Sequence, residues 1–451
     1  MTIQPPTATT TTTAAGAVSD DIPSALYRKI AWRLLPVIAI AYAVAIIDRV
    51  NIGFAKLQMS PDIGLSAAAY GLGAGIFFLA YCLFEMPSNI ILERVGARLW
   101  ISRILVTWGL VTIGTAFVQN TEQFYIARIL LGIAEAGFYP GMIFYLSRWF
   151  PRRRLGRALA LMVIAGPIGS TLVGPLSGWM ISTFHGSGSL HGWQWMFILQ
   201  GIPAVLMGIL FYTTMVDSPA KATWLSADEK AILLAAVPAT NTRERMLPTL
   251  RAALSTGRIW LLGLVLAANY LGTYAVIFWL PTIIASLGID DVATVGYLSA
   301  IPWAVAVLAT IAVGIYCDRR QTHSVVVFAG MAVAAAGLIV AIAFGHNFSV
   351  TIIGISCAAA FFTATGPVIW TITNLQLASM TAAAAGIALV NAIASLGSFL
   401  GPYLVGIGRD LTGSVVAPLA AIAAVNFLGG ALMILLERTR RRPAATVRDL
   451  T

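Results

Sequence analysis

Residues 40–51 read Ile-Ala-Tyr-Ala-Val-Ala-Ile-Ile-Asp-Arg-Val-Asn, an apolar run that ends in the charged neighbours Asp48 and Arg49. An ion within the hydrocarbon core of a membrane is costly, so such side chains usually face a polar cavity and find partners there. The stretch therefore predicts a polar site inside a membrane-spanning helix, and its partners must come from other segments of the chain.

The composition is that of an integral membrane protein. Of the 451 residues, 59% are hydrophobic and 10% are charged, whereas a soluble chain carries about 25% charged residues. The net charge of +10 lies in loops between apolar segments, where basic residues set topology and contact anionic lipid head groups. No compact basic domain remains to bind nucleic acid. The three cysteines have no metal-binding or redox spacing and are interpreted as small buried hydrophobic residues.

The apolar segments predict an all-α membrane protein with two six-helix halves around a central cavity. A membrane-spanning helix needs about 20 mostly apolar residues. The predicted halves are 28–215 and 258–438, joined by a cytoplasmic linker at 216–257, with a disordered cytoplasmic tail at 1–27 and a second tail at 439–451. The twelve predicted spans are 34–54, 70–92, 99–118, 123–146, 156–181, 194–215, 259–281, 293–316, 323–344, 349–372, 382–405 and 415–436.

Basic residues alternate from loop to loop. The loop at 148–157 alone holds five arginines, whereas the loops on the other side hold Lys56 and Arg409 against several acidic residues. Because basic loops stay in the cytoplasm, this asymmetry predicts that both termini are cytoplasmic. A weak internal repeat supports the two halves, since an acid followed by basic residues comes after the second span of each half. Two such repeats place a binding site near the middle of the membrane.

Span four supplies candidate partners for Asp48 and Arg49. Arg128 and Glu135 are seven residues apart, which puts them on one helix face about 10.5 Å apart. Asp48 lies about 21 Å along span one, at a depth similar to that of Arg128. Two acids and two bases can share one cavity as ion pairs. The alternative interpretation is a structural salt-bridge cluster that locks the helices together.

With these residues the chain resembles a major facilitator superfamily transporter and, within it, the anion:cation symporter family. The resemblance covers residues 28–438. It rests on Asp48-Arg49-Val50-Asn51, Pro87-Ser88-Asn89, Glu93-Arg94-Val95-Gly96-Ala97-Arg98, Arg128 with Glu135-Ala136-Gly137, Arg148-Trp149-Phe150-Pro151 and Asp217-Ser218-Pro219. It implies that Asp48 and Glu135 carry protons and that Arg49 and Arg128 bind a substrate carboxylate. The guanidinium fork suits a carboxylate because it is bidentate and permanently charged. An anion that competes for the arginine favours protonation of the acid, and this coupling is reciprocal.

Further candidates lie in both halves. Tyr81 in span two can donate to substrate oxygens or simply pack as an aromatic residue. Glu85, one turn further, is a third titrating group or, in the favoured interpretation, an inner-gate partner for a loop arginine. The superfamily resemblance assigns gating to Glu93, Arg94 and Arg98 in the first half and to Asp318 and Arg319 in the second. The substrate-binding candidates of the second half are Tyr274, Trp370, Asn374, Asn391 and Ser395, of which the resemblance favours Asn391.

We therefore expect an inner-membrane transporter that imports a small organic anion, such as a sugar acid, a hydroxy-dicarboxylate or an aromatic acid, by proton symport. Its expected partners are the anion, protons and membrane lipids, with the proton in place of a cofactor and a monomeric chain. Aromatic residues such as Tyr139 and Trp279 are expected near the cavity, where they suit stacking on a ring or a sugar face. An exchanger or uniporter remains open, because the Gly-Pro pairs of span five partly resemble an antiporter motif, although close packing explains them too. A membrane receptor would be expected to carry an output domain, for which the linker and the tails are too short. An enzyme would need a nucleophile–base pair or a metal cluster, and the sequence shows neither.

Overall fold

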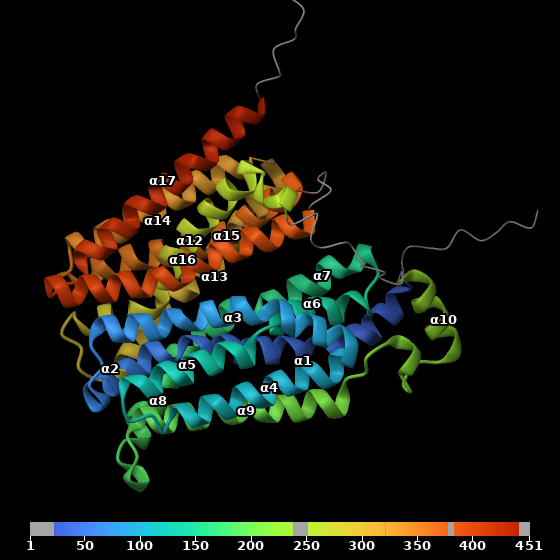
Figure 1. Cartoon of the computed structure of the whole chain (residues 1–451), viewed down its shortest axis with the longest axis horizontal. Helices are drawn as coiled ribbons and strands as arrows, with labels where there is room; N and C mark the ends of the chain where they lie inside the picture. Colours follow the sequence, from blue (N-terminus) through green and yellow to red (C-terminus); the bar gives the residue numbers. More distant parts are fainter. Residues whose placement is uncertain (1–21, 238–250, 321, 378–382, 442–451) are drawn as a thin grey trace, which may run out of the picture.

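The computed structural model describes residues 22–237, 251–320, 322–377 and 383–441, and this part of the chain is built of helices without a strand (Figure 1). In the first half the helices are α1 (Ser24–Val50), α2 (Ile52–Ile63), α3 (Ala67–Val95), α4 (Ala97–Thr115), α5 (Thr121–Glu135), α6 (Phe138–Ser147), α7 (Arg152–Val163), α8 (Ala165–Phe184) and α9 (Gly192–Thr214). The remaining helices are α10 (Ala227–Ala236), α12 (Gly257–Ala285), α13 (Val292–Arg320), α14 (His323–Ala343), α15 (Phe348–Leu377), α16 (Ala383–Thr412) and α17 (Val416–Arg441).

The predicted spans correspond to these helices. Eleven helical stretches of the described chain are long and apolar enough to cross a membrane, with α1 and α2, α5 and α6, and α7 and α8 each forming one stretch. The twelfth is α4, which packs along α9 and occupies the place of predicted span three. The first stretch runs from Ser24 to Ile63 and is longer than the predicted 34–54. This stretch therefore begins inside the predicted N-terminal tail at 1–27. Residues 1–21 of that tail and residues 442–451 of the second tail lie outside the described chain.

Span four differs from the continuous helix that was predicted. It breaks between α5 and α6, because Gly137 adopts a φ of +85°, a conformation that suits glycine and strains other residues. The carbonyl of Ala136, released at the break, accepts a hydrogen bond of 2.7 Å from the Ser88 hydroxyl of α3. A Cβ at position 137 would lie 2.5 Å from that hydroxyl oxygen. The break therefore places Glu135 at the last residue of α5.

The two halves meet through close helix crossings at glycines. In the crossing of α8 and α13, a Cβ on Gly178 would lie 2.7 Å from the carbonyl oxygen of Val292, and Gly174 and Gly296 face each other even more closely. In the crossing of α3 and α16, a Cβ on Gly71 would lie 2.5 Å from the Pro402 carbonyl oxygen. Small residues permit such close helix approach in a membrane. The close packing expected for the glycines of span five is thus present, and it joins the two halves.

The halves converge at the end of the molecule that carries α2 and diverge towards the end that carries α10 (Figure 1). The crossings agree with this picture, because Gly71 lies near the start of α3, and Gly178 lies near the end of α8. We call these the α2 end and the α10 end. The loop pattern of basic residues predicts that the α10 end is cytoplasmic.

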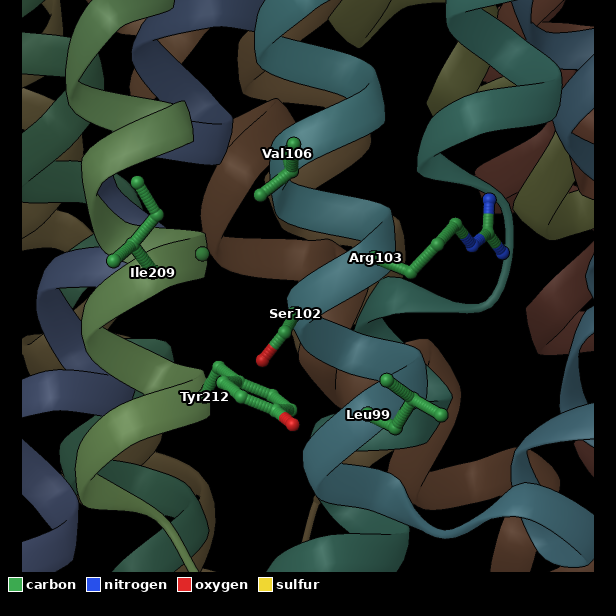
Figure 2. Close-up of a pocket in the computed structure, with 7 residues that line it drawn as sticks. Leu99, Ser102, Arg103, Val106, Ile209 and Tyr212 are labelled. Carbon is green, nitrogen blue, oxygen red and sulfur yellow. The ribbon is translucent and has the colours of Figure 1, made fainter.

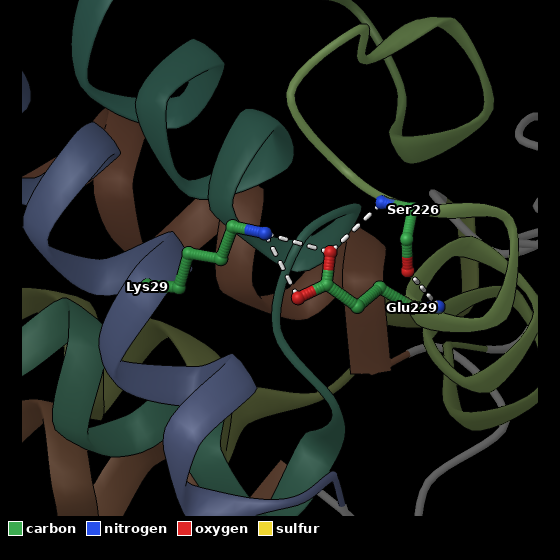
Figure 3. Close-up of polar contacts among 3 residues, drawn as sticks. All are labelled: Lys29, Ser226 and Glu229. Carbon is green, nitrogen blue, oxygen red and sulfur yellow. Dashed lines mark hydrogen bonds and ion pairs between the residues drawn. The ribbon is translucent and has the colours of Figure 1, made fainter.

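The first part of the linker docks on the first half at the α10 end. Glu229 of α10 forms a salt bridge with Lys29 of α1, with an N–O distance of 2.7 Å (Figure 3). Ser226 caps the same helix by accepting a hydrogen bond of 3.1 Å from the Glu229 backbone N–H. The ring of Trp224 stacks on the ring of Trp149 with a centroid distance of 5.5 Å. These contacts make α10 an extension of the first half.

Candidate functional site

Arg49 and Glu135 form an ion pair that joins α1 to the end of α5. The Glu135 side chain is 1% exposed, whereas the Arg49 side chain is 19% exposed. The pair is therefore accessible only on its Arg49 side. Its position confirms that the two charged motifs of spans one and four meet, and it selects Glu135 rather than Asp48 as the partner of Arg49.

Arg128 approaches the same place from the middle of α5. Its guanidinium lies 5.0 Å from the centroid of the Phe77 ring, and the guanidinium of Arg49 lies 5.4 Å from the same ring. The Arg128 Nε donates to the carbonyl of Gly73 at 3.2 Å. Its Nη2 and the Nε of Arg49 are buried and have no hydrogen-bond partner among the described residues. Two arginines that share one ring thus hold unused N–H groups, although buried polar groups are usually satisfied.

Asp48 points away from Arg49, towards α4. Its carboxylate accepts hydrogen bonds from the indole N–H of Trp108 and, at 2.6 Å, from the Thr112 hydroxyl. The Asn51 side chain donates a third bond at 3.1 Å. The Asp48 side chain is buried, and it forms no salt bridge within the described chain. Of the ion pairs predicted for the cluster, one is therefore present among the described residues, between Arg49 and Glu135, while neutral donors hold Asp48.

Sequence reasoning missed Trp108 and Thr112 as site residues. Both side chains are fully buried in α4. Their spacing of four residues places them on one helix face, which is the only sequence signal that could have identified them. A tryptophan and a threonine in an apolar helix are ordinary core residues, and only the proximity of Asp48 shows their role.

Aromatic side chains surround the arginines. The guanidinium of Arg49 lies 5.5 Å from the centroid of the Tyr81 ring. In the second half, Tyr274 contacts Phe78 with a centroid distance of 4.4 Å, and the Trp370 indole N–H donates to the Tyr270 hydroxyl at 3.1 Å. In the first half, the rings of Tyr42 and Tyr139 contact each other with a centroid distance of 5.7 Å. Rings from both halves therefore lie near the ion pair.

Other predicted residues of the second half have different places. Asn391 of α16 donates a hydrogen bond of 3.0 Å to the Glu85 carboxylate of α3, so a polar bridge crosses between the halves. This corrects the expectation that Glu85 pairs with a loop arginine. Ser395 donates back to the Asn391 carbonyl of its own helix at 2.9 Å. Asn374 is exposed near the end of α15. Trp279, which was expected near the cavity, packs beside Lys56 at the α2 end.

The predicted gate residues lie at the α10 end. Arg98 is held inside the first half, because its backbone N–H donates to Asp217 at 2.8 Å and its Nε donates to the Tyr212 carbonyl at 2.6 Å. The gating role of Arg98 stays a prediction. Glu93 and Arg94 are exposed and form no hydrogen bond or ion pair with another described residue, apart from the backbone bonds of helix α3. Asp318 and Arg319 are exposed at the end of α13.

A separate shallow groove of about 290 Å³ lies between α4 and α9, away from the charged cluster (Figure 2). Arg103 borders this groove, but its guanidinium lies 3.9 Å from the centroid of the Trp100 ring and points away from the groove in Figure 2. The groove is lined by Leu99, Ser102, Arg103, Val106, Gly208, Ile209 and Tyr212. Within the described chain, no group of three or more His, Cys, Asp or Glu side chains could hold a metal ion.

Comparisons with known proteins agree with this architecture. A sequence profile described as Major Facilitator Superfamily matches residues 38–402. The chain is similar to the putative metabolite transport protein NicT of Pseudomonas putida, with 42% identity over 91% of this chain and 94% of that protein. It is also similar to a putative tartrate transporter of Agrobacterium vitis, with 40% identity over 96% of this chain and 95% of that protein.

The fold has solved counterparts. A bacterial homologue of the human lysosomal transporter Spinster superposes with a TM-score of 0.74 at 17% identity, covering 91% of this chain and 97% of that one. This likeness concerns the fold, while the profile and the relatives in sequence identify the family. The chain therefore belongs to the Major Facilitator Superfamily and is a multi-pass membrane transporter, not an enzyme.

Proposed function

We propose that this transporter imports a small organic anion together with protons by alternating access across a bacterial inner membrane. The observation that carries the proposal is the pair of unused guanidinium N–H groups on Arg49 and Arg128 beside the Arg49–Glu135 ion pair. A carboxylate is the ligand that such N–H groups bind best, because the hydrogen bonds are charge-assisted and can be bidentate.

The ion pair gives the coupling. A substrate carboxylate that binds Arg49 displaces the carboxylate of Glu135, which is then buried without its cation. A buried carboxylate in that position neutralises by taking up a proton. Proton uptake in turn frees Arg49 for substrate, so each ligand favours the binding of the other. One substrate carboxylate group and one proton add no net charge to the site, which lowers the cost of enclosing them in the membrane.

Asp48 is proposed as a second proton site. Its three hydrogen-bond donors satisfy the carboxylate without a cation, so substrate cannot act on it by displacing an arginine. Protonation of Asp48 would disturb the bonds to Trp108 and Thr112 and thus the contact between α1 and α4. We therefore assign substrate-linked proton exchange to Glu135 and a role in the rearrangement of α1 to Asp48.

The substrate class rests on the arginines and on the relatives. Two of the similar proteins are named putative tartrate transporters, and another is named a quinolone resistance transporter, at 36% identity. The ring-bearing side chains Tyr81, Tyr274 and Trp370 suit a substrate with an aromatic ring or a sugar face. A panel of labelled organic acids should therefore include hydroxy-dicarboxylates, sugar acids and aromatic carboxylates.

The test is uptake into proteoliposomes with and without an inward proton gradient. The wild type should accumulate at least one acid of the panel only with the gradient. Glu135→Gln should lose this accumulation but keep counterflow exchange. The matched control is Glu122→Gln, the same change at an exposed glutamate in the first turn of α5, which should transport as the wild type does. Equal wild-type uptake with and without the gradient would refute proton symport and favour an exchanger or uniporter.

A further inference from the structure

Lys56 is a buried lysine that the proposed transport chemistry does not use. It lies in α2, and its side chain is 6% exposed. The ammonium lies 3.2 Å from the centroid of the Trp279 ring and 4.4 Å from that of the Tyr70 ring. It donates one hydrogen bond of 3.2 Å, to the Thr282 hydroxyl. Within the described chain no carboxylate lies within ion-pair distance of it.

The surroundings of Lys56 come from both halves. Lys56 and Tyr70 belong to α2 and α3 of the first half, whereas Trp279 and Thr282 belong to α12 of the second. The Tyr70 hydroxyl donates across the same boundary to the Phe278 carbonyl at 3.0 Å. The indole of Trp279 is fixed by its own N–H, which donates to the Pro402 carbonyl at 3.1 Å. The cage around the ammonium therefore exists only while the halves are together at the α2 end.

We propose that Lys56, Trp279 and Tyr70 form a charged gate that closes the α2 end of the transporter, the side predicted to face outwards. A buried ammonium must exchange its hydration for other partners, and two aromatic faces supply much of that exchange. If the rings withdraw, the charge can recover solvation only through water, which reaches it when the halves part. The gate thus favours a fully closed or a fully open state over a partly open one.

A neighbouring contact at Asp410 also holds the two halves together at the α2 end. The carboxylate of Asp410, in α16 of the second half, accepts hydrogen bonds of 3.1 and 2.8 Å from the backbone N–H groups of Ala67 and Ala68. These are the first residues of α3, where the partial positive charge of a helix favours an anion. Opening of the α2 end must break these bonds together with the Lys56 cage. The gate requires alternating access, but not the proposed substrate or coupling ion.

The test is a double-mutant cycle in which double electron–electron resonance measures the distance between two spin labels. Spin labels are placed at the exposed positions Glu122 and Leu411, one in each half near the α2 end, after the three native cysteines are changed to serine. Trp279→Leu should raise the ratio of open to closed states by about tenfold or more, because it leaves the ammonium buried without its nearest ring. In the Lys56→Met background the same change should alter the ratio less than about threefold, since the buried ammonium is gone. The remaining cation at this ring, Arg409, lies further away, at 5.8 Å from the Trp279 centroid, and is partly exposed. Lys56→Met alone should keep the α2 end mostly closed.

Trp279→Phe serves if Trp279→Leu does not fold, because it keeps a smaller ring at the same place. It should open the α2 end to a smaller extent, again only in the presence of Lys56. An equal effect of either Trp279 variant in both backgrounds would overturn the proposal, because Trp279 would then act by packing alone. An unchanged ratio in Trp279→Leu with Lys56 present would overturn it as well.

Discussion

Replacement of Arg128 by lysine tests whether the unused guanidinium N–H binds the substrate anion. Lysine keeps the positive charge but loses the guanidinium fork, so the Nη2 that has no hydrogen-bond partner among the described residues disappears. A hydrogen bond to a charged group contributes about 1.5–3 kcal/mol. At about 1.4 kcal/mol per tenfold change, loss of one such bond should raise the half-saturating concentration of an accepted acid about 10- to 150-fold.

The assay is the concentration dependence of gradient-driven uptake in proteoliposomes, with the melting temperature of the purified variant measured in parallel. Arg103→Lys provides the control, because it makes the same change at an arginine that stacks on Trp100 outside the charged cluster. It should leave the half-saturating concentration unchanged. A fall in the melting temperature of Arg128→Lys with unchanged half-saturation would refute the substrate role and leave Arg128 as a structural partner of Gly73.

Three further changes test the supports of the site. Trp108→Phe keeps a ring but removes one donor from the buried Asp48 carboxylate, so it should lower the free energy of unfolding by about 1–3 kcal/mol and reduce transport, as measured by thermal unfolding and uptake. Gly137→Ala forces a left-handed conformation on a residue with a Cβ, at a cost of about 1–2 kcal/mol, and should displace the end of α5; normal stability with normal uptake would contradict the importance of the break. Hydrogen bonding from Lys29 lowers the pKa of Glu229 below its ordinary value, so the Lys29–Glu229 salt bridge should hold at neutral pH and weaken as the pH falls below the ordinary glutamate value of about 4.3. The mobility of a spin label on α10 should rise over that range, and in Lys29→Ala it should already be high at neutral pH.

The charged residues of the site could be predicted because they are exceptions to their surroundings. Asp48, Arg49, Arg128 and Glu135 stand in apolar helices, where an ion needs a partner, and the structure brings Arg49 and Glu135 into contact. The seven-residue helical spacing of Arg128 and Glu135 is kept in the structure, since both lie in α5 before the break. What the sequence could not supply was the choice of partners, because Asp48 is held by neutral residues of α4 that follow no charge pattern.

Other features escaped prediction because they depend on how distant segments meet. Gly137 could equally have been a packing glycine, and neither its positive φ nor its close approach to Ser88 of α3 is marked in the sequence. Trp279 was expected near the cavity as an aromatic residue that suits stacking on a substrate, yet the register of α12 against α2 places it beside Lys56. Glu85 was assigned a basic partner on charge alone, whereas the structure offers the amide of Asn391. In each case the deciding contact crosses between helices.

The proposed site and the contact between the halves are linked over a short distance. Hydrogen bonds between α3 and α16 lie at more than one point along α3. Among the described residues, the Glu85–Asn391 bond is the one furthest from the α2 end. Tyr81, whose ring lies beside the guanidinium of Arg49, precedes Glu85 by one helical turn on the same face. An anion bound at Arg49 as proposed would therefore lie about one turn from the residue that bridges the halves. Substrate binding could then act on the closure of the α10 end through α3 alone, because one rigid helix carries both contacts and no longer chain of coupled residues is required.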